Sequence, residues 1–147
     1  MPSIQVVSAP SLTHANAALG RLFFAEQDRV RGGPVPELCA PEYSASIGGN
    51  PKMDRSGHEG FSLAFYAGFP DARHEIVDVF ATDDRVAVRF VIHGTHTGPF
   101  FGIPASGRRV RAVANVLMHV HDGRVTNLEG VFDEAGLLRQ IGVLPGG

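Results

Sequence analysis

Two carboxylates near the end of the chain, Glu129 and Asp133, have the residue type and the setting that proton transfer requires. They lie in an apolar run that follows Asp122-Gly123, a dipeptide typical of a two-residue type I′ hairpin turn. Such a turn fixes the register of the strands on both sides, and alternation then places both acids on one face with the small residues Ala112 and Ala114. Small side chains beside acids predict a pocket, and burial raises the pKa of a carboxyl group toward the range that suits acid–base catalysis.

Structural roles for the two carboxylates stay open on this evidence. Asp133 directly precedes the leucine-containing segment 134–138, so it could cap a closing helix, and Glu129 could face water at an open rim. Four strand residues separate the two acids, about 13 Å at roughly 3.3 Å per residue, so they form no contacting pair unless a bulge intervenes. We therefore expect them at different depths of one cavity.

Seven histidines raise the question of a metal site. His119 and His121 fall on the opposite sheet face in this register, and with His93 and His96 they provide no third ligand at a recognisable spacing. We therefore expect no metal, and for His96 a structural hydrogen bond at a strand end. Ser46 lacks the surroundings of a nucleophile elbow, which disfavours a hydrolase triad.

Further side chains are candidates for contact with a substrate. Tyr43 and Tyr66 are either hydroxyl donors to a substrate oxygen or ordinary rim and core rings. Phe100 and Phe101 belong to an apolar tip between two strands, which predicts a lid over the pocket or a contact with a partner subunit. The residues expected to bind substrate are Tyr43, Ser46, Phe65, Tyr66, Phe90, Phe100, Phe101, Ala112, Ala114, Val116 and Met118.

The elements that must position these residues change period half-way along the chain. Apolar residues recur at helical spacing over 12–30, with Ser11 or Thr13 as the cap, and the capping box at 56–59 starts a second helix that ends before Phe69. Between them, the proline-rich segment 34–51 permits a short helix and a loop but no long element. The rest of the chain predicts strands over 74–82, 85–94, 108–121 and 124–132, and a short helix over 134–143.

This order of elements predicts an α+β fold in which a strongly curved antiparallel sheet wraps around the N-terminal helices and encloses a pocket. Both faces of the last hairpin are substantially apolar, whereas an antiparallel sheet usually leaves one face to water. The helices can cover only one face, so we expect a homodimer through the outer sheet face.

Length and composition exclude several classes of protein. A chain of 147 residues predicts a single domain over 1–147, and a net charge of -2 without a long basic block disfavours nucleic acid as a partner. The first residues carry no basic leader and no stretch is apolar enough to span a bilayer, so we expect neither targeting nor a membrane. The one cysteine, Cys39, cannot form an internal disulfide and fits the cytoplasm.

Four stretches of the second half resemble the SnoaL-like polyketide cyclase family of the nuclear transport factor 2-like (cystatin-like) superfamily. The resemblance implies a cone-shaped α+β barrel, usually dimeric, with a deep pocket that closes a ring in a polyketide intermediate of antibiotic-type biosynthesis without metal or organic cofactor. It also implies that Asp133 matches the acid–base aspartate of the family. The stretches are Phe69-Pro70-Asp71, residues 94–110 with Gly94-Thr95-His96 and Gly107-Arg108-Arg109-Val110, Asp122-Gly123-Arg124-Val125, and residues 133–145 from Asp133 to Pro145.

The sequence departs from the family at two positions that matter for chemistry. Many relatives carry His-Trp where this chain has Leu128-Glu129, and His or Asn where it has Ser46. Either Glu129 takes part of the role of the missing polar residues, or closure depends on the shape of the pocket, as in a [4+2] cycloaddition, in which little charge develops. The alternatives to a cyclase are another cofactor-free lyase, isomerase or hydratase of the superfamily, and a non-catalytic binder of a hydrophobic small molecule.

Overall fold

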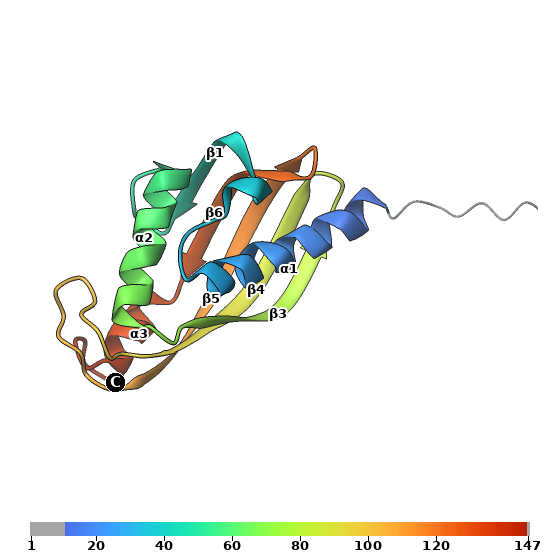
Figure 1. Cartoon of the computed structure of the whole chain (residues 1–147). Coiled ribbons are helices and arrows are strands. Elements are labelled where there is room, and N and C mark those ends of the chain that lie inside the picture. The colour runs from blue at the N-terminus through green and yellow to red at the C-terminus, as the bar shows by residue number, and fades with distance from the viewer. Residues whose placement is uncertain (1–10, 147) are drawn as a thin grey trace, which may run out of the picture.

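The structure is a computed structural model that describes residues 11–146 (Figure 1). Its helices lie where the apolar residues have helical spacing, and its strands lie where they alternate. The helices are α1 (Leu12–Val30), the 3-10 turn η1 (Pro36–Leu38), α2 (Arg55–Gly68) and α3 (Glu134–Gln140). The strands are β1 (Cys39–Ile47), β2 (Met53–Asp54), β3 (Arg73–Ala81), β4 (Arg85–Thr95), β5 (Arg109–His121) and β6 (Arg124–Phe132).

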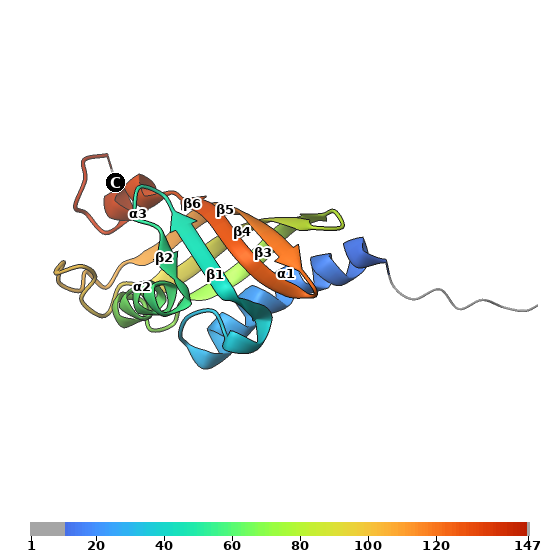
Figure 2. The same ribbon diagram turned by 90° about the horizontal axis from the view of Figure 1, so that it is seen from above.

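The strands form one curved sheet in the order β2-β1-β6-β5-β4-β3. Neighbouring strands are antiparallel except β1 and β6, which are parallel, so the sheet is mixed rather than wholly antiparallel as predicted. Helices α1 and α2 lie on the same side of the sheet, and Figure 2 shows that side from a second direction. The predicted α+β fold is confirmed, with a sheet that curves around the helices but does not close.

The prediction that segment 34–51 holds no long element is wrong. The short helix exists as η1, but it is followed by the nine-residue strand β1. In β1 the side chains of Tyr43, Ala45 and Ile47 are buried, and the serines between them are half-buried. This alternation is the strand signal. Of the prolines in the segment only Pro41 lies within β1, before the alternating part, and the others lie outside the strand.

Both long helices begin at side-chain caps, one of them predicted. The Ser11 side chain accepts a hydrogen bond from the His14 amide at 3.1 Å, which confirms the first cap. The capping box at 56–59 is wrong, because Asp54 is the cap of α2 and accepts from the Gly57 amide at 2.8 Å. A carboxylate two residues earlier satisfies the free amides, so α2 starts sooner than predicted.

The predicted hairpin turn is confirmed. Asp122 and Gly123 have φ angles of 50° and 73°, the left-handed conformation that a type I′ turn requires at both positions. His121 therefore lies opposite Arg124, as the turn predicts.

The register predicted from that turn is wrong a few residues further on, because a β-bulge intervenes. His119 lies opposite Asn127, so Thr126 is an extra residue in β6, and its hydroxyl donates to the His119 carbonyl at 3.2 Å. A shift of one residue exchanges the two faces of a strand. Beyond the bulge, Leu128, Gly130 and Phe132 face the helices, whereas Glu129 and Asp133 face away.

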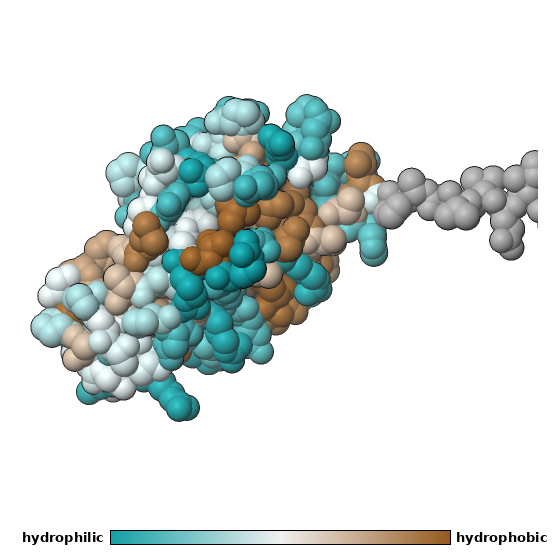
Figure 3. All heavy atoms as spheres, in the orientation of Figure 1, coloured by the Kyte–Doolittle hydropathy of each residue, from teal (hydrophilic) through white to brown (hydrophobic). Residues whose placement is uncertain are grey.

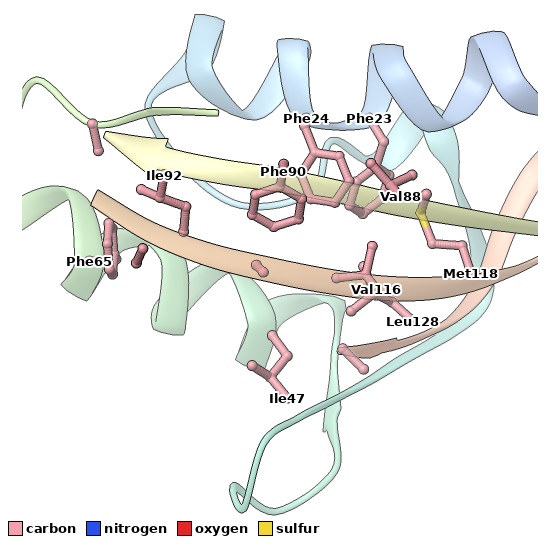
Figure 4. Packing of buried hydrophobic residues seen from close by; sticks show 14 of the residues in the cluster. Phe23, Phe24, Ile47, Phe65, Val88, Phe90, Ile92, Val116, Met118 and Leu128 are labelled. Carbon is pink, nitrogen blue, oxygen red and sulfur yellow. The ribbon is translucent and has the colours of Figure 1, made fainter. Parts of the chain in front are cut away.

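The interior between the sheet and the helices is filled at one end. Phe23, Val86, Val88 and Met118 are at most 2% exposed there. A Cβ atom added to Gly20 would lie 2.7 Å from Val86 Cγ1, so α1 and the sheet are in close contact. Figure 4 shows Phe24 and Phe90 packed together farther along, with the other end of the interior beyond them.

Apolar side chains are also exposed on the outside of the molecule. Phe80, Val131 and Val77 are exposed on β3 and β6. On the face drawn in Figure 3, hydrophobic residues gather near the middle, and the exposed apolar residues of the helices include Leu22, Val30 and Leu63. None of the described helices combines the length and the hydropathy that crossing a bilayer requires.

Candidate functional site

A pocket occupies the end of the interior between α1, α2 and the concave face of the sheet. Its empty space is about 630 Å³ when the open mouth and the solvent space in front of it are included. Most of the lining is apolar and rich in aromatic rings. The lining residues are Phe24, Gln27, Ile47, His58, Phe61, Ser62, Phe65, Tyr66, His74, Phe90, Ile92, Ala114, Val116, Leu128, Gly130, Val131 and Phe132.

The structure divides the predicted substrate-binding residues into two groups. The pocket lining includes Phe65, Tyr66, Phe90, Ala114 and Val116. The other six lie outside the pocket lining. Ala112 and Met118 are in the packed core, and Tyr43 is buried with its hydroxyl hydrogen-bonded to His58. Ser46 is half-buried on β1, Phe100 is buried against Phe65 and Phe69, and Phe101 is exposed.

The two predicted catalytic carboxylates do not reach the pocket. Glu129 is exposed and lies opposite Leu117 on the outer face, because the bulge shifts β6 by one residue. Asp133 is also exposed, and its side chain accepts a hydrogen bond from the Gly136 amide at 2.9 Å as the N-cap of α3. The prediction that both acids point into the cavity is therefore wrong, and the geometry assigns Asp133 the structural role that the sequence left open.

The pocket instead contains a histidine that is hydrogen-bonded to a carboxylate. His74 of β3 lines the pocket, and its Nδ1 atom lies 2.7 Å from Asp28 Oδ1. The same carboxylate accepts from the His74 amide at 2.7 Å and from the Tyr66 hydroxyl at 2.7 Å. Burial alone would raise the pKa of Asp28, but these hydrogen bonds and the His74 charge outweigh it and lower the pKa.

An ionised carboxylate only accepts hydrogen bonds, so His74 donates from Nδ1. None of the described residues bonds its Nε2 atom, which is therefore free on the ring that borders the pocket and offers a lone pair whenever the imidazole is neutral. Phe24 and Phe90 pack against each other and against this ring, with centroids 5.2 Å and 4.9 Å from it. An imidazole oriented by a carboxylate in this way is suited to act as a general base.

A second histidine, His58 of α2, borders the same pocket in the opposite tautomer. Its Nδ1 atom lies 2.8 Å from the Tyr43 hydroxyl. Burial, with a smaller contribution from the charge of His74, lowers the pKa of His58 to about 4, so the ring is neutral at neutral pH.

The phenol of Tyr43 is buried, and Nδ1 of His58 is its one hydrogen-bond partner among the described residues. The phenol therefore donates its proton to Nδ1, because otherwise that buried proton would have no acceptor. The ring proton of His58 then sits on Nε2. A neutral imidazole that donates from a buried position stabilises negative charge that develops on a substrate oxygen.

The histidines considered for a metal are dispersed. His93 bonds Glu75 at 2.8 Å, and His96 is fully buried with Nδ1 2.8 Å from the Ser106 hydroxyl, as expected for a structural role. His119 and His121 lie at the far end of β5, and within residues 11–146 no group of three histidine, cysteine or acidic side chains could hold a metal ion.

Comparison with known proteins places this pocket in a family. The model of the SnoaL-like polyketide cyclases matches residues 21–141. The chain belongs to this family. It is 29% identical over 114 residues to the aklanonic acid methyl ester cyclase DnrD of Streptomyces peucetius, an alignment that covers 74% of this chain and 77% of DnrD.

Solved structures agree with the SnoaL-like assignment. IdmH from Streptomyces antibioticus has a TM-score of 0.70 at 29% identity, with 88% of this chain and 96% of IdmH covered. AclR from Streptomyces galilaeus has a TM-score of 0.78 at 24% identity, with 88% and 82% covered, and at that identity it supports the fold alone. The family and the fold that the sequence resemblance implied are therefore confirmed.

The polar residues of this SnoaL-like pocket left a signal in the sequence. His58, Ser62 and Tyr66 recur every fourth residue and share one face of α2 with the aromatic stripe. On α1, Gln27 is buried although it is polar, and Asp28 follows it. Polar residues within an apolar helical stripe are the pattern to seek, because the interior that they face must be wet or must bind a polar ligand.

Proposed function

We propose that this SnoaL-like protein is a polyketide cyclase that closes a carbon–carbon ring in a polyketide-derived intermediate of antibiotic-type biosynthesis by acid–base assistance. The observation that carries the proposal is the pair of histidines at one pocket, each with one ring nitrogen bonded to a protein group and with an Nε2 atom that none of the described residues bonds. DnrD supports the substrate class, since its name states that it acts on aklanonic acid methyl ester.

An aldol closure uses these two groups without any other reactant. Nε2 of His74 takes a proton from the carbon next to one carbonyl, and the Nε2–H of His58 stabilises the enolate oxygen or the carbonyl under attack. The enolate carbon then bonds to the second carbonyl carbon, whose oxygen gains a proton as the alkoxide becomes a hydroxyl. The proton lost from carbon thus balances the proton gained by oxygen, and the product is an isomer of the substrate.

The pocket walls contribute orientation. Flat apolar rings line several sides of the pocket, and a flexible chain can fold against them so that its reacting ends meet. These rings belong to Phe24, Phe61, Phe65, Phe90 and Phe132. If shape alone drives the closure, as in a [4+2] cycloaddition, the histidines are dispensable. If the protein only binds, ligands occupy the pocket without turnover.

Turnover of aklanonic acid methyl ester by matched histidine variants tests the proposal. We expect His74→Gln to lower kcat by about 10²- to 10⁴-fold, the usual contribution of a general base. His93→Gln is the control, because His93 lies outside the pocket and bonds Glu75. Equal kcat values for His74→Gln and the wild type would refute acid–base assistance, and binding without cyclisation by the wild type would leave the non-catalytic alternative.

We also propose that two copies of the chain associate through the outer sheet face and that the protein functions in the cytoplasm. Phe80 of β3 is 68% exposed on that face, an unfavourable position for so large an apolar side chain in an isolated sheet. Light scattering should give the mass of a dimer for the wild type and of a monomer for Phe80→Ser. The control is Leu22→Ser on the helix side, and dissociation by the control alone would place the interface there.

The buried thiol of Cys39, whose pKa burial raises to about 11, suits a reducing compartment such as the cytoplasm.

A further inference from the structure

One buried polar atom at the pocket has no hydrogen-bond partner within residues 11–146. Gln27 of α1 is 3% exposed and lines the pocket between α1 and α2. Its amide nitrogen donates to the Ser62 hydroxyl at 3.3 Å, a long bond, whereas its Oε1 atom bonds none of the described residues. Buried acceptors in folded proteins are nearly always satisfied, so this one requires an explanation.

The position of Gln27 indicates what would satisfy it. The terminal torsion of a glutamine amide is soft, so Oε1 can reorient toward a ligand in the pocket that Gln27 lines. Around it the pocket is lined by the rings of Phe24, Phe61 and Tyr66. An amide oxygen is an acceptor only, and the surrounding rings favour a planar apolar body.

We infer that Gln27 is a recognition residue for a hydroxyl group carried on a planar, aromatic or enolic part of the substrate. The hydroxyl donates to Oε1, and the ring that carries it lies among the aromatic side chains. This inference rests on the proposed function and narrows it: the preferred polyketide has a phenol or enol at the end that lies between α1 and α2, whereas its reacting carbonyls lie toward His58 and His74. A molecule of the same shape without the donor leaves Oε1 unsatisfied and binds less well.

A pair of naphthalene probes tests this recognition without any turnover. 2-Naphthol offers the donor, and 2-methoxynaphthalene keeps the ring and the oxygen but lacks the donor. The chain contains no tryptophan, so naphthalene fluorescence reports binding directly. Comparing the ratio of the two Kd values between wild type and Gln27→Leu cancels the general difference in hydrophobicity between the probes. We expect Gln27→Leu to lower the preference for 2-naphthol by about five- to tenfold, the usual effect of one buried hydrogen bond.

Two further variants make the result specific. Gln27→Met, which keeps the length of the side chain, should lose the same preference, and melting curves of both Gln27 variants establish that they fold. His74→Phe should retain the preference, since it removes the proposed base and not the hydroxyl acceptor. An unchanged ratio in Gln27→Leu, or a ratio lost in His74→Phe and kept in Gln27→Leu, would overturn the inference. No reaction is measured in this test, so it is independent of the cyclisation assay. The inference can fail while His74→Gln still lowers cyclisation, and it can hold while His74→Gln leaves cyclisation unchanged.

Discussion

The two ends of the interior are built on the same strands and differ in what faces them. At the packed end, Met118 of β5 lies opposite Val86 of β4, and neither is exposed. At the pocket end, Ala114 lies opposite Phe132 and Val116 opposite Gly130, so small side chains leave room on alternate strands. Polar side chains from α1 and α2 then border this space. Burial alone therefore does not define a core, because one alternating strand supplies both a packed layer and the wall of a cavity.

Substitutions that change side-chain volume should have opposite effects at the two ends. Met118→Ala removes a fully buried side chain and should lower the free energy of unfolding by about 2–5 kcal/mol. Ala114→Leu adds three carbon atoms to a wall of the pocket, so we expect a loss smaller than the about 1–3 kcal/mol that overpacking a filled core costs, together with loss of ligand binding. Denaturant unfolding and probe binding measure both quantities. A comparable loss of stability in Ala114→Leu would mean that the pocket end is as tightly packed as the other.

The buried histidine of the pocket end should make stability depend on pH. The pKa of folded His58 is about 4, below its ordinary value of 6.5, so the unfolded chain takes up this proton first as the pH falls. The stability linked to His58 is fully present above about pH 6.5 and is lost progressively down to about pH 4, which amounts to about 3 kcal/mol.

Denaturant unfolding at pH 7 and pH 4.5 checks this dependence in the wild type and in His58→Gln, which keeps an acceptor for Tyr43. Other acid-sensitive groups, such as Asp28, contribute equally to both proteins. The variant should therefore lose clearly less stability between the two pH values than the wild type does, and equal losses would contradict a neutral buried His58.

The exposed acid at the end of β6 should have the smallest effect. Asparagine caps helices as well as aspartate, so Asp133→Asn should change neither the melting temperature nor kcat, whereas Asp133→Ala should cost about 1 kcal/mol through loss of the cap of α3. Melting curves and turnover of the two variants decide between a cap and a catalyst. A large fall in kcat for Asp133→Asn with unchanged melting would restore the carboxylate as the acid–base group.

The sequence predicts the elements well and the site poorly, for a physical reason that one strand illustrates. Helical and strand periodicity place α1 and β3 to β6 within one or two residues, and the positive φ angles demanded by Asp122-Gly123 follow from the turn alone. The bulge at Thr126 depends on a side-chain bond to the His119 carbonyl and on the pairing of β6 with β1, which are tertiary features. One extra residue then exchanges the faces and moves both predicted catalytic acids out of the pocket.

The central claim is that the imidazoles of His58 and His74 border one pocket with their protons on opposite ring nitrogens, and long-range ¹H–¹⁵N NMR correlation of the rings measures this directly. At pH 8 the account predicts a proton on Nε2 of His58 and on Nδ1 of His74, with assignments made from His58→Gln and His74→Gln. A proton on Nδ1 of His58 or on Nε2 of His74 would leave the pocket without its donor or without its base, and would contradict the account.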